Sequence, residues 1–164
     1  MGRDGFIQAG KFELTLFRAD GDGGWRVERH ANPRDPEGKW PNLFTTEGQN
    51  YLANLQATSP NSVVNHMIVG TATVAAAYAS VVASLGEVDR NTIATRTSAV
   101  NVLTEVCTFA GGLDSITSLS IRAIGCSNDA RSGQGILRAL TVLGTGVVLA
   151  NSDYLQVNYT TTVS

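Results

Sequence analysis

The feature that most constrains this chain is the series of short alternating segments in its second half. Turn residues such as Gly111-Gly112 and Gly144-Thr145-Gly146 separate these segments, which resemble half-buried strands. Such spacing is typical of antiparallel strands and not of βαβ units. We therefore expect a mainly β fold, an antiparallel β-sandwich of the jelly-roll type. The predicted strands cover residues 92–97, 100–109, 116–125, 136–143 and 154–163.

The first forty residues predict a β-hairpin. Apolar and polar residues alternate over residues 11–18 and again over 25–30, and the intervening ADGDGG is rich in residues that tolerate positive φ. Residues 31–41 hold three of the four prolines and predict an irregular linker. We expect an N-terminal hairpin arm with a proline-rich linker over residues 1–41, and a β-sandwich body with a leading helix over residues 42–164.

One short helix is expected near residue 46. Thr46 and Gln49 have the spacing of a capping box, and Tyr51, Leu52 and Leu55 then form an apolar stripe. The pattern predicts about three turns within residues 42–57. Gly48, in the first turn, costs about 1 kcal/mol relative to Ala, so this helix needs packing to persist.

The middle of the chain predicts one buried strand and a loop. Residues 63–70 (VVNHMIVG) are almost continuously apolar, as in a strand covered on both faces, and we expect His66 to be a hydrogen-bonded core residue and not a ligand. Residues 71–87 are rich in alanine and predict a loop with a short helix.

Charge is concentrated at the N-terminus. Residues 1–40 hold 14 of the 26 charged residues, which leaves 12 for residues 41–164. This second part is far below the roughly 25% of charged residues in typical domains. We expect much of its surface to face other subunits; a Thr/Ser-rich soluble domain is the alternative. Binding to nucleic acid requires clustered Lys and Arg residues, and the sequence contains no such patch, so we expect no nucleic-acid partner. No apolar run approaches the roughly 20 residues of a membrane span, and no signal peptide is evident, so we expect a protein made in the cytoplasm.

The sequence offers little catalytic chemistry. His30 and His66 are the only histidines, no nucleophile elbow or P-loop is present, and carboxylates such as Glu47 and Glu87 have no distinctive spacing. Asp20 and Asp22 match only part of a calcium loop. We expect no enzyme activity, no cofactor and no bound metal.

Two cysteines, Cys107 and Cys126, lie in strand-like segments. Buried free thiols are the expected state without an export signal, and a disulfide is the alternative that spacing alone leaves open.

Five segments together resemble structural proteins of tailed-phage virions. These are the hairpin sequence FELTLFRADG, the stretch NLFTTEGQNYL, the strand end IVGT, the stretch LGEVDR and the closing Thr-rich strand, at residues 12–21, 42–52, 68–71, 85–90 and 154–163. The closest resemblance is to small capsid decoration, or cement, proteins; the linker at residues 31–41 is longer and richer in proline than in that pattern.

This resemblance implies a function, partners and a location. The expected protein is a non-enzymatic clamp on the outside of the capsid, assembled in the host cytoplasm, that binds the major capsid protein and itself as a dimer or trimer. A tail, baseplate or fibre-attachment protein in contact with the host is the alternative. The residues expected to face the partner are Phe12, Leu14, Trp25, Arg26, Arg29, Arg34 and Trp40.

Overall fold

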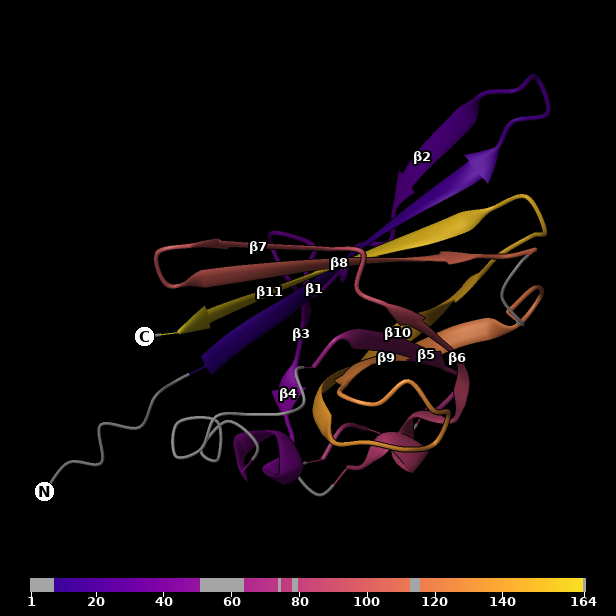
Figure 1. The fold of residues 1–164 in the computed structure, drawn as a ribbon. Helices are drawn as coiled ribbons and strands as arrows, with labels where there is room; N and C mark the ends of the chain where they lie inside the picture. Colours follow the sequence, from indigo (N-terminus) through magenta and orange to yellow (C-terminus); the bar gives the residue numbers. More distant parts are fainter. Residues whose placement is uncertain (1–7, 51–63, 74, 78–79, 113–115, 164) are drawn as a thin grey trace, which may run out of the picture.

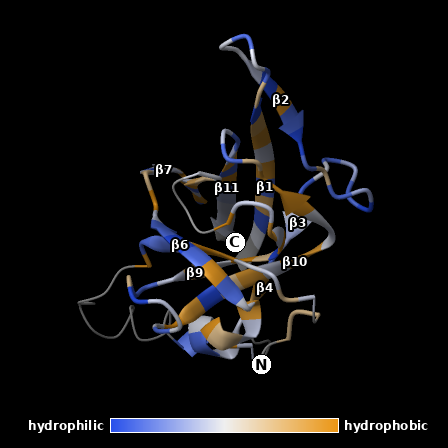
Figure 2. Cartoon of the chain, turned by 90° about the vertical axis from the view of Figure 1, so that its right-hand side faces the viewer, coloured by the Kyte–Doolittle hydropathy of each residue, from blue (hydrophilic) through white to orange (hydrophobic). Residues whose placement is uncertain are grey.

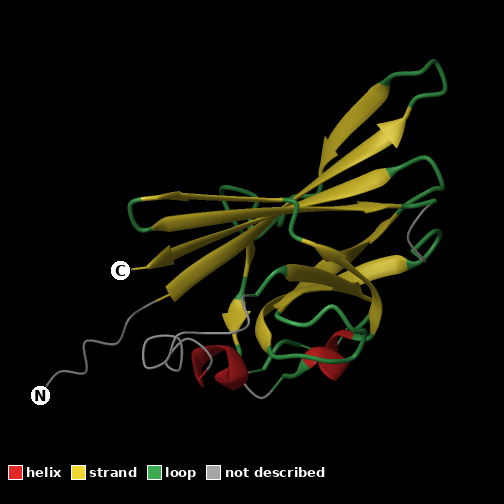
Figure 3. Cartoon of the chain, viewed as in Figure 1, coloured by secondary structure: helices red, strands yellow, loops and turns green. Residues whose placement is uncertain are grey.

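The computed structural model describes residues 8–50, 64–73, 75–77, 80–112 and 116–163. Within them the fold is mainly β, as expected, and consists of two antiparallel sheets that face each other as two layers (Figure 1). Figure 3 shows that the helical turns lie beside the second sheet.

The first sheet, sheet A, has β1 and β11 at its centre. Its strand order is β2-β1-β11-β8-β7, and β3 pairs with the earlier part of β1, on residues that β2 does not reach. The strands are β1 (Gln8–Ala19), β2 (Trp25–Arg29), β3 (Trp40–Pro41), β7 (Thr95–Ala99), β8 (Val102–Ala110) and β11 (Tyr154–Val163).

The second sheet, sheet B, has the order β4-β10-β9-β5-β6. A 3-10 helix, η1 (Val82–Leu85), precedes its β6 strand. The strands are β4 (Leu43–Phe44), β5 (His66–Gly70), β6 (Glu87–Thr92), β9 (Ser120–Ser127) and β10 (Leu137–Val148).

The main core fills the space between the two sheets. Phe12 of β1 lies opposite Tyr159 of β11, and their rings stack with centroids 4.4 Å apart. Leu14 and Val157 form the next inward-facing pair, and both are fully buried. Burying a side chain of this size contributes about 1.5–3 kcal/mol. The alternation in residues 11–18 thus places β1 inside the sandwich, and the core draws on residues from both sides of the expected boundary at residue 41.

A second, smaller core covers the outer face of sheet B. Val82 and Leu85 of η1 pack there with Ile68 of β5 and Leu140 of β10. All five residues of β5 are consequently buried, which confirms the prediction of a strand covered on both faces. The short helix expected within residues 71–87 is also confirmed.

The helix expected near residue 46 begins one residue earlier than the capping box predicted. Thr45 is its cap, because the Thr45 hydroxyl accepts a hydrogen bond from the Gly48 amide at 3.0 Å. Residues 46–50 are helical. A Cβ on Gly48 would lie 2.2 Å from the Arg138 carbonyl oxygen, so glycine allows the first turn to touch β10. The expected stripe of Tyr51, Leu52 and Leu55 lies outside the described residues.

Several strand boundaries differ from the prediction; β9, for example, begins at Ser120 and not at residue 116. Residues 92–97 do not form one strand, because the chain leaves sheet B at Thr92 and enters sheet A at Thr95. By contrast, Gly144-Thr145-Gly146 does not end a strand. The pairing of β10 with β9 shifts register between Val142 and Val147, and β10 continues through this bulge.

Candidate binding surface

Most of the residues considered for catalysis or metal binding make hydrogen bonds or packing contacts within the fold. His30 stacks on Trp40, and its Nε2 lies 2.9 Å from the Thr145 carbonyl oxygen. The Asp20 carboxylate accepts hydrogen bonds from the amides of Asp22 and Gly24 and so closes the β1–β2 turn. Among the described residues, no group of three or more His, Cys, Asp and Glu side chains is placed to hold a metal ion.

His66 is buried, as expected, but its Nδ1 atom has no hydrogen-bond partner among the described residues. The expectation of a hydrogen-bonded histidine is therefore not met at this atom. Burial and the nearby charge of Arg90 lower the His66 pKa, so the ring is held neutral in the folded chain.

A buried ion cluster connects the two sheets. Glu105 of β8 has no exposed surface and contacts Arg96 of β7 at 2.6 Å and Arg138 of β10. Both cysteines are buried as thiols that are not joined in a disulfide, and burial raises the pKa of Cys126 to about 12. The thiol is thus protonated and serves as core volume, which agrees with the expected free thiols.

The LGEVDR segment organises a neighbouring loop. Glu87 and Arg90 form a buried ion pair at 2.8 Å. Arg90 also donates to the carbonyl oxygens of Asp129 and Gln134, and Glu87 accepts from the Gly133 amide. Because the partners all lie in the loop before β10, these two side chains fix that loop to the start of β6.

The residues expected to face a partner divide into two groups. Phe12, Leu14 and Trp40 are core residues with little or no exposure, so they are not available to a partner in this fold. Trp25, Arg26 and Arg29 of β2 are exposed, and so is Arg34 in the loop that follows. The alternation that predicted β1 also predicts that its alternate apolar residues face the core, which explains Phe12 and Leu14. Trp40 lies in β3, where its indole N–H donates to the His30 carbonyl oxygen at 2.9 Å.

An apolar patch lies on the outer face of the exposed hairpin. Phe17 is paired with both Val27 and Tyr154, so these three side chains share one face, and Trp25 lies two residues from Val27 on the same face. The Tyr154 ring stacks on Phe17 at 4.4 Å and meets the edge of Trp25 at 4.9 Å. Trp25 and Val27 remain 49% and 59% exposed. We call Phe17, Trp25, Val27 and Tyr154 the hairpin patch.

The hairpin that carries this patch projects from the molecule. Figure 1 shows β2 and the end of β1 extending beyond the two layers, and Figure 2 shows polar and apolar bands alternating along them. On the opposite face of the hairpin, Arg18 binds Glu28 at 3.1 Å and Asp153 at 2.7 Å. These ion pairs hold the projecting strands against the start of β11.

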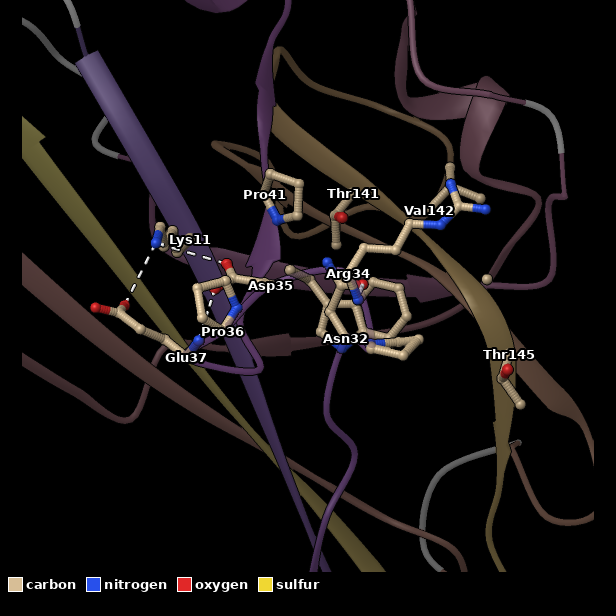
Figure 4. Close-up of a pocket in the computed structure, with 13 residues that line it drawn as sticks. Lys11, Asn32, Arg34, Asp35, Pro36, Glu37, Pro41, Thr141, Val142 and Thr145 are labelled. Atoms are coloured by element: carbon tan, nitrogen blue, oxygen red, sulfur yellow. Dashed lines mark hydrogen bonds and ion pairs between the residues drawn. The ribbon is translucent and has the colours of Figure 1, made fainter.

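A groove opens where the 32–37 loop approaches the exposed edge of β10. It has a volume of about 850 Å³ and is lined by Arg34, Asp35, Trp40 and Thr141, among others. Figure 4 shows Arg34 reaching over it towards Val142. A second hollow of about 500 Å³, lined by Ala76 and Arg122, lies next to it. Both hollows share Pro41, Thr141, Val142 and Gly144, and we call them together the β10-edge groove.

Within the described part of the chain, no helix is both long and apolar enough to pass through a bilayer.

No protein-family model, curated protein or solved structure matches this chain.

Proposed function

We propose that this chain is a structural, non-enzymatic protein of a tailed-phage virion, a decoration protein that binds the major capsid protein on the outside of the shell as a small oligomer. The proposal rests first on the sequence segments that resemble such proteins. Several of them have defined places in the fold, since FELTLFRADG lies in β1 and the turn after it, IVGT contains the end of β5, and LGEVDR joins η1 to β6. A sandwich of two antiparallel sheets is also compatible with the jelly-roll architecture that we propose for it.

The observation that carries the proposal is the hairpin patch. An exposed tryptophan beside an exposed valine, on a hairpin that extends beyond the layers, is the type of apolar anchor that dominates protein interfaces. The ion pairs of Arg18 hold the hairpin in place, so little conformational entropy is lost when the patch is covered. In our proposal, the patch contacts the major capsid protein.

The outer edge of sheet A supports self-association. β7 is the last strand of that sheet and all five of its residues are exposed. Its sequence, TRTSA, has no lysine or proline that would discourage edge pairing, and Arg96 is already paired with Glu105. We propose that a second copy pairs along this edge in the oligomer.

Substitution within the patch tests the proposal. The double variant Trp25→Ala/Val27→Ser should lose at least about tenfold in affinity for purified capsid shells that lack this protein, because an anchor of this kind is worth about 2 kcal/mol or more. Co-sedimentation measures the loss. Val102→Ser is the matched control, since Val102 is a partly exposed valine at the opposite end of sheet A.

Two results would contradict the proposal. If the Trp25/Val27 variant binds shells as tightly as the wild type does, the patch does not contact the major capsid protein. A copy number in purified virions far below that of the shell subunit, with the protein located at the tail, would instead favour the tail, baseplate or fibre-attachment function. Quantitative mass spectrometry of virions, together with electron cryomicroscopy, distinguishes these locations.

A further inference from the structure

The positive charges of this protein are almost all neutralised internally. The chain has twelve Lys and Arg residues, of which Arg3 lies outside the described residues. Nine of the remaining eleven form ion pairs with described carboxylates. Among the described residues, the two that form none are Arg34 and Arg122. Both line the β10-edge groove, one in each hollow.

Arg122 is the more informative of the two because it is only partly exposed. A guanidinium that is partly removed from water without a counter-ion is unfavourable, and a bound carboxylate would offset that cost. The backbone is shaped to leave it room: a Cβ on Gly146 would lie 3.2 Å from Arg122 Cγ and 2.0 Å from Ser120 Oγ. Glycine in the β10 bulge therefore lets this arginine lie beside the strand.

The groove also contains an incomplete sheet edge. β4 pairs only with Ala139 and Leu140 of β10, and no other described strand continues that edge of sheet B. The Thr45 amide donates to the Arg138 carbonyl on this side. Backbone groups alternate in direction along a strand, so Val142, four residues on, presents its amide and carbonyl to the open edge. His30 contacts the Thr145 carbonyl, which limits the open edge to about residues 141–144.

We propose that the β10-edge groove binds an extended acidic segment of another protein, which adds a short strand beside Val142 and places carboxylates on Arg34 and Arg122. Side chains of an added strand point alternately to the two faces of the sheet. The two hollows share Pro41, Thr141, Val142 and Gly144, so one extended segment beside Val142 can place a carboxylate near each of the two arginines.

The carboxylates that already line the groove do not satisfy these arginines. Asp35 and Glu37 are both held by Lys11, at 3.5 and 3.3 Å. The Asp35 carboxylate also accepts a hydrogen bond from the Glu37 amide at 2.8 Å. The loop charges are thus paired among themselves, and the unpaired charge of the groove is positive. An extended peptide fits better than a nucleic acid, because the open backbone edge offers a strand partner that phosphates cannot use.

Selection from a displayed library of random ten-residue peptides tests the inference on the whole chain. We expect enriched peptides to carry at least two acidic residues. The variant Arg34→Gln/Arg122→Gln should bind a selected peptide at least tenfold more weakly. Arg26→Gln, which removes one exposed charge outside the groove, should bind it as the wild type does. Methylation of alternate peptide amides should also abolish binding, because it removes the donors that pair with β10.

Several results would overturn the inference. These are no enrichment of acidic peptides, equal binding by the Arg34/Arg122 variant, or displacement of a selected peptide by single-stranded oligothymidylate at equal concentration. Circular dichroism of the variant separates lost binding from lost folding. The inference is independent of the capsid proposal, which is tested at Trp25 and Val27 on shells, so either can fail without the other.

Discussion

At the scale of single residues, close backbone contacts account for sequence features that propensity alone treats as unfavourable. Gly48 weakens a helix by its propensity, yet the approach of the helix to β10 requires it. Gly146 has the same role beside Ser120 and Arg122. From the sequence, both glycines indicate only a weak helix and a broken strand, because the atom that each one must accommodate is distant in the chain.

Gly48→Ala should destabilise the protein despite its better helix propensity. The added Cβ would meet a carbonyl oxygen of β10, and we expect the free energy of unfolding to fall by about 1–3 kcal/mol, as for other overpacked sites. Urea unfolding measures it. Gly144→Ala is the control, because a Cβ there would meet nothing within 4 Å. A Gly48→Ala variant as stable as the wild type would show that the helix can move away from β10.

His66 should make stability depend on pH. Its pKa is lowered in the folded chain, first by burial, so the unfolded chain binds a proton at a higher pH than the folded one does. The free energy of unfolding should therefore decrease as pH falls below the ordinary histidine pKa of about 6.5. His66→Gln should flatten the curve between about pH 7 and 5. Urea unfolding at several pH values in this range measures both curves. If the free energy of unfolding changes with pH equally in the wild type and the variant, His66 does not have this role.

At the scale of elements, alternation and turn residues predicted most strands, and they failed where packing decides. The β1–β2 hairpin, β5 and β11 follow the predicted pattern closely. β3 and β4 were missed, because two-residue strands have no periodicity. The change of sheet between β6 and β7 was missed as well, since no Gly, Pro or other turn residue marks residues 93–94, where the chain crosses from one layer to the other.

The Glu87–Arg90 pair should determine the order of the loop before β10. Arg90→Ala leaves the Glu87 carboxylate buried without a counter-ion, and we expect a loss of about 3–5 kcal/mol in the free energy of unfolding. Proteolysis within residues 128–135 should become faster.

The matched control for this prediction is Arg131→Ala, on the same loop. Arg131 is 77% exposed in its pair with Asp129, and such surface pairs contribute about 0–1 kcal/mol. Equal stability losses in Arg90→Ala and Arg131→Ala would show that burial of the first pair is unimportant.

At the scale of the whole molecule, the candidate surfaces arise from the stacking of the two sheets. The β10-edge groove combines the 32–37 loop, residues 73, 75 and 76, and β10, and nothing in their separate sequences indicates that they meet. The hairpin patch could be predicted in part from the sequence, since Trp25 was expected at a partner surface. Its companions Phe17 and Tyr154 come from different ends of the chain, and only strand pairing brings them together.

The central position of β1 and β11 in sheet A has a consequence for biosynthesis. Gln8 to Phe17 pair with Tyr154 to Val163, so the first described strand finds one of its neighbours only when the last has left the ribosome. Until then, the inward face of β1, with Phe12 and Leu14, has no partner across much of sheet A. Contacts between residues so far apart in the sequence also form slowly during folding. The nascent chain must therefore be kept from aggregating until β11 has left the ribosome, and sheet A is completed only then.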